Sequence, residues 1–369
     1  MSRLLASDRG ALAFAEQLLT LLREGSFTAT YKYAVILALM DLCLEHSTRK
    51  GMAPNSVTTS QLAEKVVELY WPHAREFRGK LVLRQNAGSQ AAIVRLISRF
   101  REDSPAEAGA SLIRSKLADP AGWGRLLRDV EWKLVEMPLP KLQRLGAETV
   151  PFIYQITWSD DIRKSEFNSP DFDNLIRLVP GSGDHLVRLA GLLRPLVCRE
   201  WAALVAHLNQ DVIDDPELDQ FLFGVDRSSL RPVTSPLREL QDDRCFYCHD
   251  PLSAKAQVDH FVPWSRYPDN GLDNLVLAHP RCNRDKRDHL AATVHVSHWV
   301  ERGKRRSTDL AAIAAKVSWP RAAARTVSVA RSIYLRLPQE ARLWQIEDEF
   351  VPARRDELAS LLVTAGWGA

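Results

Sequence analysis

The chain has 369 residues, of which 46% are hydrophobic and 26% charged, and its formal net charge is +3. This composition excludes extensive disorder and a uniformly polycationic chain, and the length predicts two or three domains rather than one core. The most apolar stretch, residues 34–40, is too short to cross a bilayer, and residues 2–25 lack the unbroken apolar region of a secretory signal. We therefore expect a cytoplasmic protein with no membrane partner.

The first 208 residues are dominated by apolar side chains at helical spacing, which predicts a large helical N-terminal domain. Thr58 and Gln61 have the spacing of a capping box, and the apolar stripe that follows them stops before Pro72. Residues 152–158 are rich in β-branched and aromatic side chains and predict a strand. The other predicted helices centre on residues 14–22, 33–44, 93–100, 123–135 and 186–208.

Residues 211–236 differ in character, because they combine several prolines with acidic residues that include Asp211, Asp214 and Asp215. We interpret this segment as an acidic connector and place a domain boundary near Leu237. Apolar stripes return at residues 310–317 and 327–337, which predicts a helical C-terminal region. The expected organisation is a helical domain at 1–236, a small domain at 237–292 and a helical region at 293–369.

Three of the five cysteines belong to a pattern that is typical of zinc sites. Cys245 and Cys248 are spaced C-x-x-C, and His279 and Cys282 form a matching H-x-x-C pair about thirty residues later. Four such ligands close a tetrahedral structural Zn²⁺ site, which would stabilise a segment too small to build its own core. The remaining cysteines, Cys43 and Cys198, lie among apolar helical residues and are expected to be buried thiols.

A second pattern lies between these two pairs. Residues 257–262 predict a strand that contains Asp259 and His260 and ends at Pro263. Asn274 begins a second short apolar run, and a basic helix is expected from Asn283. Two short strands and a helix around a metal-sized gap are therefore predicted.

These residues resemble the HNH endonuclease family, whose ββα-metal core reads D-H…N…C-N-x-x-K between two zinc knuckles. The resemblance covers Cys245 to Leu290 and departs from the family pattern where His279 replaces a cysteine and where the turn reads Asp-Asn-Gly. It implies that His260 is the general base and that Asp259 and Asn283 bind a catalytic metal. It also implies that Asn274 braces the loop that bears His260.

The chemistry of these side chains agrees with the implied roles. A neutral imidazole titrates near physiological pH, so His260 can take a proton from water. One carboxylate oxygen and one amide oxygen, from Asp259 and Asn283, suit Mg²⁺ or Mn²⁺ better than zinc. Adjacent strand residues point to opposite faces, so Asp259 and His260 can serve one site only if the strand ends or kinks there.

Basic residues are concentrated after the second cysteine pair, with thirteen Lys or Arg against four Asp or Glu between Arg281 and Arg336. Such a local excess attracts phosphate backbones, although it is equally typical of a solvated helical surface. We expect nucleic-acid contacts in two groups, one along the helix of the HNH segment and one in a basic tail. The first group is Arg281, Arg284, Lys286 and Arg287, and the tail is Arg302, Lys304, Arg305, Arg306, Arg321 and Arg325.

The sequence thus predicts a mostly α protein with a small zinc-stabilised ββα-metal domain that cuts DNA, as in bacterial restriction or anti-phage defence proteins. The helical N-terminal domain would sense or position a target. The alternatives are a catalytically idle zinc-stabilised nucleic-acid binder, an RNA-cleaving enzyme or toxin with the same core, and a scaffold whose nuclease segment is idle. Partners besides DNA, such as other defence proteins or a second copy of the chain, stay open.

Overall fold

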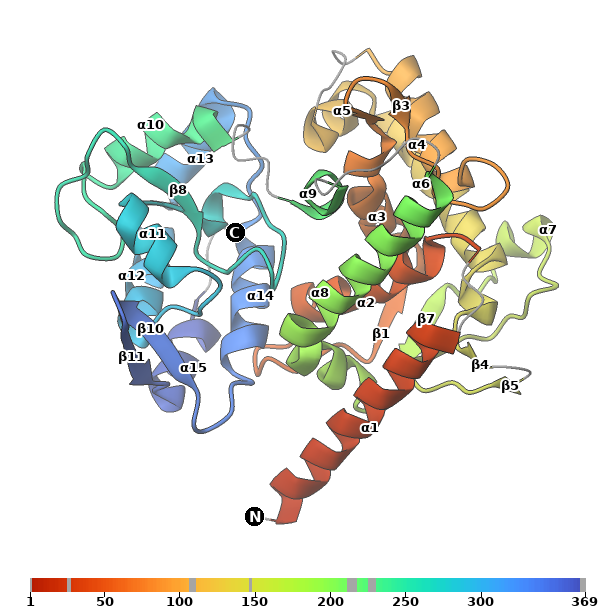
Figure 1. The fold of residues 1–369 in the computed structure, drawn as a ribbon, viewed down its shortest axis with the longest axis horizontal. Coiled ribbons are helices and arrows are strands. Elements are labelled where there is room, and N and C mark those ends of the chain that lie inside the picture. Colours follow the sequence, from red (N-terminus) through yellow and green to blue (C-terminus); the bar gives the residue numbers. More distant parts are fainter. Residues whose placement is uncertain are drawn as a thin grey trace. The chain divides into compact units, whose positions relative to one another are not determined.

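The computed structural model of the chain describes residues 2–24, 28–105, 111–145, 148–210, 218–224 and 230–365. The chain divides into two compact units, the first made of residues 1–43 and 54–224 and the second of residues 44–53 and 225–369. Helices predominate in both, and the strands form small sheets (Figure 1). The predicted mostly α architecture is therefore confirmed. In the described residues, no helix combines the length and apolarity that a membrane crossing requires.

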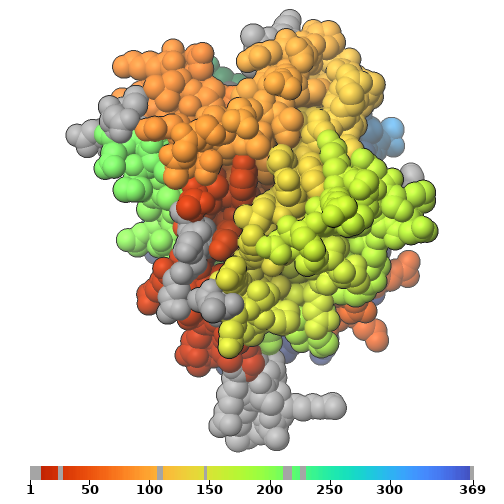
Figure 2. Space-filling view, turned by 90° about the vertical axis from the view of Figure 1, so that its right-hand side faces the viewer, coloured from red at the N-terminus to blue at the C-terminus, as the bar shows by residue number. Residues whose placement is uncertain are grey.

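The first unit is a set of packed helices with one three-stranded antiparallel sheet, in the order β1-β7-β6. Figure 2 shows one of its faces, where the segments from α4 to α7 reach the surface. Its elements are α1 (Ser2–Glu24), α2 (Tyr31–Glu45), β1 (Ser56–Thr58), α3 (Thr59–Tyr70), η1 (Pro72–Ala74), β2 (Glu76–Phe77), β3 (Leu81–Val82), α4 (Ala92–Asp103), α5 (Leu112–Ala118), α6 (Pro120–Glu136), η2 (Leu139–Lys141), β4 (Arg144–Leu145), β5 (Glu148–Thr149), β6 (Tyr154–Gln155), α7 (Lys164–Phe167), β7 (Leu175–Leu178), α8 (Ser182–Leu208) and α9 (Leu218–Phe223).

The helices predicted from apolar spacing are all present. The capping box at the start of α3 forms as expected, because the Thr58 side chain accepts from the backbone N–H of Gln61 and the Gln61 side chain accepts from that of Thr58. The strand expected at 152–158 is limited to Tyr154 and Gln155, which pair with β7. A buried ion pair between Asp41 and Arg194 joins α2 to α8.

The two cysteines outside the metal-like pattern lie in these helices. Cys43 is fully buried in α2, whereas Cys198 in α8 is only partly buried. Burial raises the pKa of the Cys198 thiol to about 11, so this side chain is a protonated thiol at neutral pH. All five cysteines are free thiols in the structure.

The second unit contains the whole zinc-type pattern together with the C-terminal elements. These are α10 (Arg231–Leu240), β8 (Gln257–His260), η4 (Leu272–Asn274), β9 (Leu275–Ala278), α11 (Pro280–Lys286), α12 (Thr293–Arg305), α13 (Ser307–Lys316), α14 (Ala323–Tyr334), β10 (Arg342–Ile346), β11 (Glu349–Pro352) and α15 (Arg355–Val363). The C-terminal region is therefore not purely helical, because β10 and β11 form an antiparallel hairpin.

The domain boundaries expected from the sequence stay predictions, and a helix spans the position near Leu237 where one boundary was placed. Leu237 lies inside α10, although both Pro232 and Pro236 fall within that helix. Pro232 occupies the first turn, where the missing N–H costs no helical hydrogen bond. Residues 211–217 and 225–229, which include Asp211, Asp214 and Asp215, lie outside the described residues.

The segments 237–292 and 293–369 lie in one compact unit because α12 completes the core of the β8–β9 hairpin. The indole N–H of Trp299 donates to the carbonyl of Asp273 at 2.8 Å, and its ring stacks on Phe261 with centroids 4.8 Å apart. The Arg302 guanidinium donates to the carbonyls of Leu275 and Asp273 at 2.7 and 2.9 Å. These contacts satisfy backbone groups at the start of β9 that would otherwise be buried without partners.

A short piece of the N-terminal sequence also belongs to the second unit. Residues 44–53, which include the last residues of α2, pack on α14. The hydroxyls of Ser328 and Ser332 donate to the carbonyl of Leu44 at 3.3 and 3.2 Å, and Arg336 donates to the carbonyl of Gly51 at 2.8 Å. The second unit is thus assembled from a short segment that interrupts the sequence of the first unit and from the chain that follows it.

Candidate metal centre and active site

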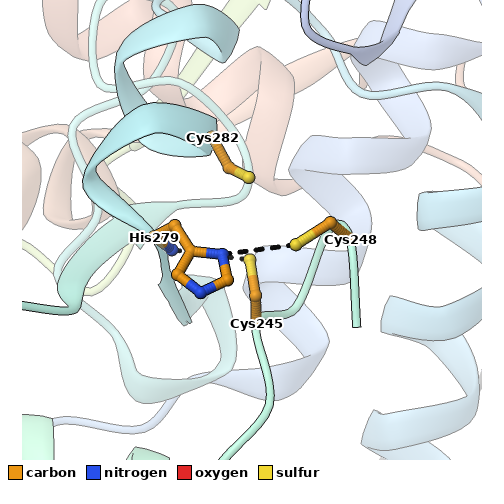
Figure 3. A group of neighbouring side chains, drawn as sticks. All are labelled: Cys245, Cys248, His279 and Cys282. Atoms are coloured by element: carbon orange, nitrogen blue, oxygen red, sulfur yellow. Dashed lines mark hydrogen bonds between the residues drawn. The ribbon is translucent and has the colours of Figure 1, made fainter. Parts of the chain in front are cut away.

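The zinc-type ligands come from two short segments, one before β8 and one after β9. The turn after α10 supplies Cys245 and Cys248, and the start of α11 supplies His279 and Cys282 (Figure 3). One ligand atom from each residue lies within 4.8 Å of the other three. Such a compact set of three sulfurs and one imidazole nitrogen fits a closed tetrahedral zinc site.

Local backbone bonds explain why these turns hold their ligands. In the first turn, the N–H of Cys245 donates to the carbonyl of Asp250 at 2.9 Å, and the N–H of His249 donates to the carbonyl of Cys245 at 3.0 Å. His279 occupies the N-cap of α11, and Pro280 follows it in the first turn. The helix therefore starts at Pro280 rather than at Asn283, which places Cys282 one turn inside it.

The ring of His279 is oriented by a contact at Nε2, the nitrogen that faces away from the cysteine sulfurs. Its Nδ1 lies 3.3 Å from the sulfur of Cys248, and its Nε2 lies 3.0 Å from the carbonyl oxygen of Pro251. A proton on Nε2 then leaves the Nδ1 lone pair directed at the sulfurs, which is the usual arrangement of a metal-bound histidine. A hydrogen bond from Cys282 and the N–H groups of neighbouring residues lower the pKa of Cys245 to about 4, so a thiolate is favoured there.

Strand β8 presents the next pair of residues, and it ends at His260. Asp259 pairs with Val276 and His260 with Leu275 on β9. The Asp259 carboxylate receives a hydrogen bond from the Tyr247 hydroxyl at 2.6 Å and lies 3.1 Å from the Lys286 ammonium. Both contacts use Oδ2 of Asp259, so a metal would bind through Oδ1.

His260 is the last residue of β8, and its hydrogen-bond partner differs from those of Asp259. Its Nε2 lies 2.8 Å from Oδ1 of Asn270, and its ring is 5.2 Å from that of Trp264. Burial lowers the pKa of His260 below its ordinary value of 6.5, opposed in part by the Asn270 hydrogen bond and by the charge of Asp259. The neutral imidazole that a general base requires is therefore the favoured form at pH 7.

The two asparagines of the pattern have distinct surroundings. Asn274 is fully buried; its Oδ1 accepts from the N–H of Val262 at 2.8 Å, and its Nδ2 donates to the carbonyls of Val262 and Asp269 at 3.2 and 3.0 Å. It therefore ties together both ends of the loop after His260. Asn283, in α11, donates through Nδ2 to the Gln257 side chain at 3.0 Å, which directs the amide oxygen elsewhere. One amide oxygen and one carboxylate oxygen are, by their chemistry, ligands that suit Mg²⁺ or Mn²⁺.

Lys286 does not lie on the surface with the other residues expected to bind phosphate. Its side chain is fully buried, and its ammonium donates to the carbonyl of His260 at 2.9 Å as well as pairing with Asp259. An ammonium that faces into the core cannot contact a duplex backbone. Through its bonds to Asp259 and to the His260 carbonyl, Lys286 instead stabilises the end of β8.

The other basic residues divide into exposed and structural groups. Arg281, Arg284 and Arg287 are exposed, although Arg287 terminates α11 with a positive φ and so lies beyond the helix expected to hold it. Lys304 and Arg305 are exposed and Arg306 is partly exposed, at the end of α12. By contrast Arg302, Arg321 and Arg325 bind carbonyl or carboxylate oxygens of residues 269–275.

Asn270, Tyr247 and Gln257 were not identified from the sequence as site residues, yet each contacts a predicted one. Asn270 lies in a turn, where asparagine is common for conformational reasons alone. Tyr247 lies between two metal-ligand cysteines, where it gives no separate signal. The contacts that reveal all three are made in space and have no periodicity in the sequence.

Comparison with protein families identifies residues 245–292 as matching the HNH endonuclease family model. The matched segment begins at the first zinc-type cysteine and extends past α11, so it includes both metal-like patterns described above. Comparisons with curated proteins and with solved structures give no match.

Proposed function

We propose, from the HNH endonuclease domain at residues 245–292, that the protein hydrolyses phosphodiester bonds of DNA with the help of Mg²⁺ or Mn²⁺. The observation that supports this most is the arrangement at the end of β8. There a buried His260 with a lowered pKa adjoins Asp259, and the zinc-type cluster fixes the neighbouring α11 that holds Asn283. Enzymes of this reaction type need a base, a metal-binding carboxylate and an ordered frame around both.

In this proposal His260 removes the proton from the attacking water. Because its imidazole is neutral at pH 7, it is ready to accept that proton without prior titration. Asp259 and Asn283 would hold the divalent ion, one through a carboxylate oxygen and the other through an amide oxygen. When bound there, the ion supplies Lewis-acid stabilisation of the phosphate and of the departing 3′ oxygen.

The remaining residues orient this set. Asn274 holds the loop after His260, and Lys286 neutralises the Oδ2 side of Asp259 while holding the backbone of His260. Arg281, Arg284, Arg287, Lys304, Arg305 and Arg306 supply phosphate contacts from the surface. One such site cuts one strand per event, so a double-strand break would need two events or two molecules.

The biological role that we propose is restriction or anti-phage defence. The motive is the size of the first unit beside so small a nuclease segment, because an HNH core grips the backbone and reads little sequence by itself. The first unit would then supply target or signal recognition, alone or with other defence proteins. A phage challenge of cells with the parent protein and with His260→Ala tests this role, and equal plaque counts would contradict it.

The chemistry is tested by incubating matched DNA and RNA of one sequence, as single strands and duplexes, with Mg²⁺ or Mn²⁺. We expect cleavage of DNA that depends on the added ion and is lost in Asn283→Ala, which breaks no buried ion pair, at unchanged zinc content. Faster cleavage of RNA would establish the RNA-cleaving alternative. Tight binding to either strand type without cleavage would favour an idle nucleic-acid binder.

A further inference from the structure

His260 is held in place by a side chain that neither the zinc-type pattern nor the HNH pattern includes. Oδ1 of Asn270 lies 2.8 Å from Nε2 of His260. Since an amide oxygen only accepts, this bond places the imidazole proton on Nε2 and leaves the lone pair on Nδ1. The contact therefore sets both the direction of the ring and the nitrogen that can accept a proton.

Asn270 is itself fixed from outside the family-matched segment. The indole N–H of Trp319 donates to the carbonyl of Asn270 at 2.7 Å. The adjoining carbonyl of Pro320 accepts from the N–H of Leu272 at 2.9 Å, so the chain between α13 and α14 is bonded to both sides of Gly271.

The next residues of both segments are also bonded, since Arg321 and Ala322 contact the Asp273 side chain. The Arg321 guanidinium lies 3.1 Å from Oδ1 of the fully buried Asp273, and the N–H of Ala322 donates to its Oδ2 at 3.2 Å. On the other side of Asn270, Asp269 accepts from the Thr326 hydroxyl in α14 at 3.0 Å. Residues 319–326 thus hold the loop 269–273 at successive points.

We propose that Asn270 and Trp319 are positioning residues for His260, so that the connection between α13 and α14 completes the active site begun by the HNH segment. The proposal rests on the role of His260 as general base. Neither residue touches substrate in this scheme: Asn270 acts on the imidazole, and Trp319 acts on Asn270. Their removal should therefore lower the rate of the chemical step and leave DNA affinity unchanged, since a misdirected base costs rate rather than binding.

Three variants separate the parts of this arrangement. Asn270→Leu keeps the side-chain size and removes the acceptor, whereas Asn270→Asp keeps an acceptor oxygen. Trp319→Phe keeps an aromatic ring and removes the N–H donor. With enzyme in excess over DNA, we expect Asn270→Leu to lower the single-turnover rate about 10- to 100-fold and Trp319→Phe several-fold less, with Asn270→Asp restoring most of the loss. Melting temperature and zinc content should match the parent.

A double-variant comparison distinguishes positioning from a general structural effect. In a His260→Ala background, Asn270→Leu and Trp319→Phe should not lower the residual rate further, because the group that they position is gone. Equal fold-losses with and without His260 would overturn the proposal, as would a parent rate in Asn270→Leu. If His260→Ala itself cleaved like the parent, the general-base role would fail instead.

A spectroscopic readout keeps the inference testable without activity. Imidazole ¹⁵N chemical shifts at a pH where His260 is neutral report which nitrogen bears the proton. In the parent we expect a single Nε2–H tautomer. In Trp319→Phe we expect a small fraction of the Nδ1–H form, and in Asn270→Leu a larger fraction. An unchanged pure Nε2–H signal in Asn270→Leu would overturn the proposal even if no cleavage were observed under any condition.

Discussion

Lys286 has a fully buried side chain, and its position decides how the end of β8 is stabilised. The ammonium pairs with Asp259 and binds the His260 carbonyl, and it lies 5.9 Å from the centre of the Tyr247 ring. A buried charge is tolerated only when its partners replace the lost hydration, and here a carboxylate, a carbonyl and a π face do so. The residue is therefore part of the fold of the site and not of its DNA-facing surface.

Replacing Lys286 by Met should therefore destabilise the second unit strongly. The substitution leaves the Asp259 carboxylate without its buried counter-ion, which typically costs about 3–5 kcal/mol of unfolding free energy. The matched control is Arg284→Met, since Arg284 is 70% exposed and lies 3.7 Å from its neighbour Asp285. Exposed pairs contribute about 0–1 kcal/mol, so the control should unfold like the parent.

The free energy of unfolding of both variants is measured by urea titration, with tryptophan fluorescence as the signal, because Trp299 and Trp344 are buried in the second unit. A Lys286→Met midpoint equal to that of Arg284→Met would show that the buried pair does not stabilise the unit.

Among the elements, the β8–β9 hairpin and α11 depend on the zinc-type cluster that joins the turn after α10 to the start of the helix. Each strand is four residues long and α11 has seven residues, and elements of this length are marginal by themselves. The cluster fixes the starting point of α11, and with it the distance from β8 at which Asn283 lies. In the proposed enzyme, a zinc ion in this cluster would therefore support the residues at the end of β8 without taking part in the chemistry.

Removing one ligand should consequently unfold this part of the protein. We expect about one zinc ion per chain in the parent and little or none in Cys282→Ser. The variant should also lose near-ultraviolet circular dichroism from aromatic rings packed in the second unit, such as Phe261 and Trp299. Cys198→Ser provides the control, because that thiol lies in α8 outside the cluster. Full zinc content in Cys282→Ser, measured by atomic emission, would contradict the assignment.

The elements also show how much the sequence could predict. The capping box at Thr58 and the cysteine turns are formed by residues three apart, so spacing alone identified them. The β10–β11 hairpin was missed because its short strands, RLWQI and EFVP, do not alternate between apolar and polar residues and lie in a region dominated by helical patterns. The contacts of Asn270 with His260 and of Trp319 with Asn270 join segments 10 and 49 residues apart, which no local periodicity encodes.

Across the whole molecule, positive charge is distributed less simply than the sequence count suggests. Arg302 is almost entirely buried, and Arg321 and Arg325 bind Asp273 and Asp269, so these residues neutralise internal groups. Lys304, Arg305 and Arg306 remain at the surface near the end of α12. The expected basic tail therefore contains two classes of residue with opposite consequences for binding and stability.

Variants of the exposed residues should change DNA binding, whereas variants of the buried residues should change stability. Neutralising Lys304, Arg305 and Arg306 together to Gln should weaken DNA binding and lower the slope of log Kd against log salt by roughly 1–3, because fewer counterions are released. Arg302→Gln should instead lower the melting temperature, since two backbone carbonyls lose their donor. Fluorescence anisotropy at several salt concentrations measures the slope, and an unchanged slope in the triple variant would remove these residues from the DNA path.

The central claim is that His260 at the end of β8 is the base of a metal-dependent DNA nuclease. It is tested most directly by comparing the parent with His260→Ala in the nicking of supercoiled plasmid with Mg²⁺ or Mn²⁺, at equal zinc content and equal melting temperature. The account predicts that the parent converts the plasmid to the nicked form and that the variant is slower by a factor of about 10² or more. Equal nicking rates for the two proteins would contradict it.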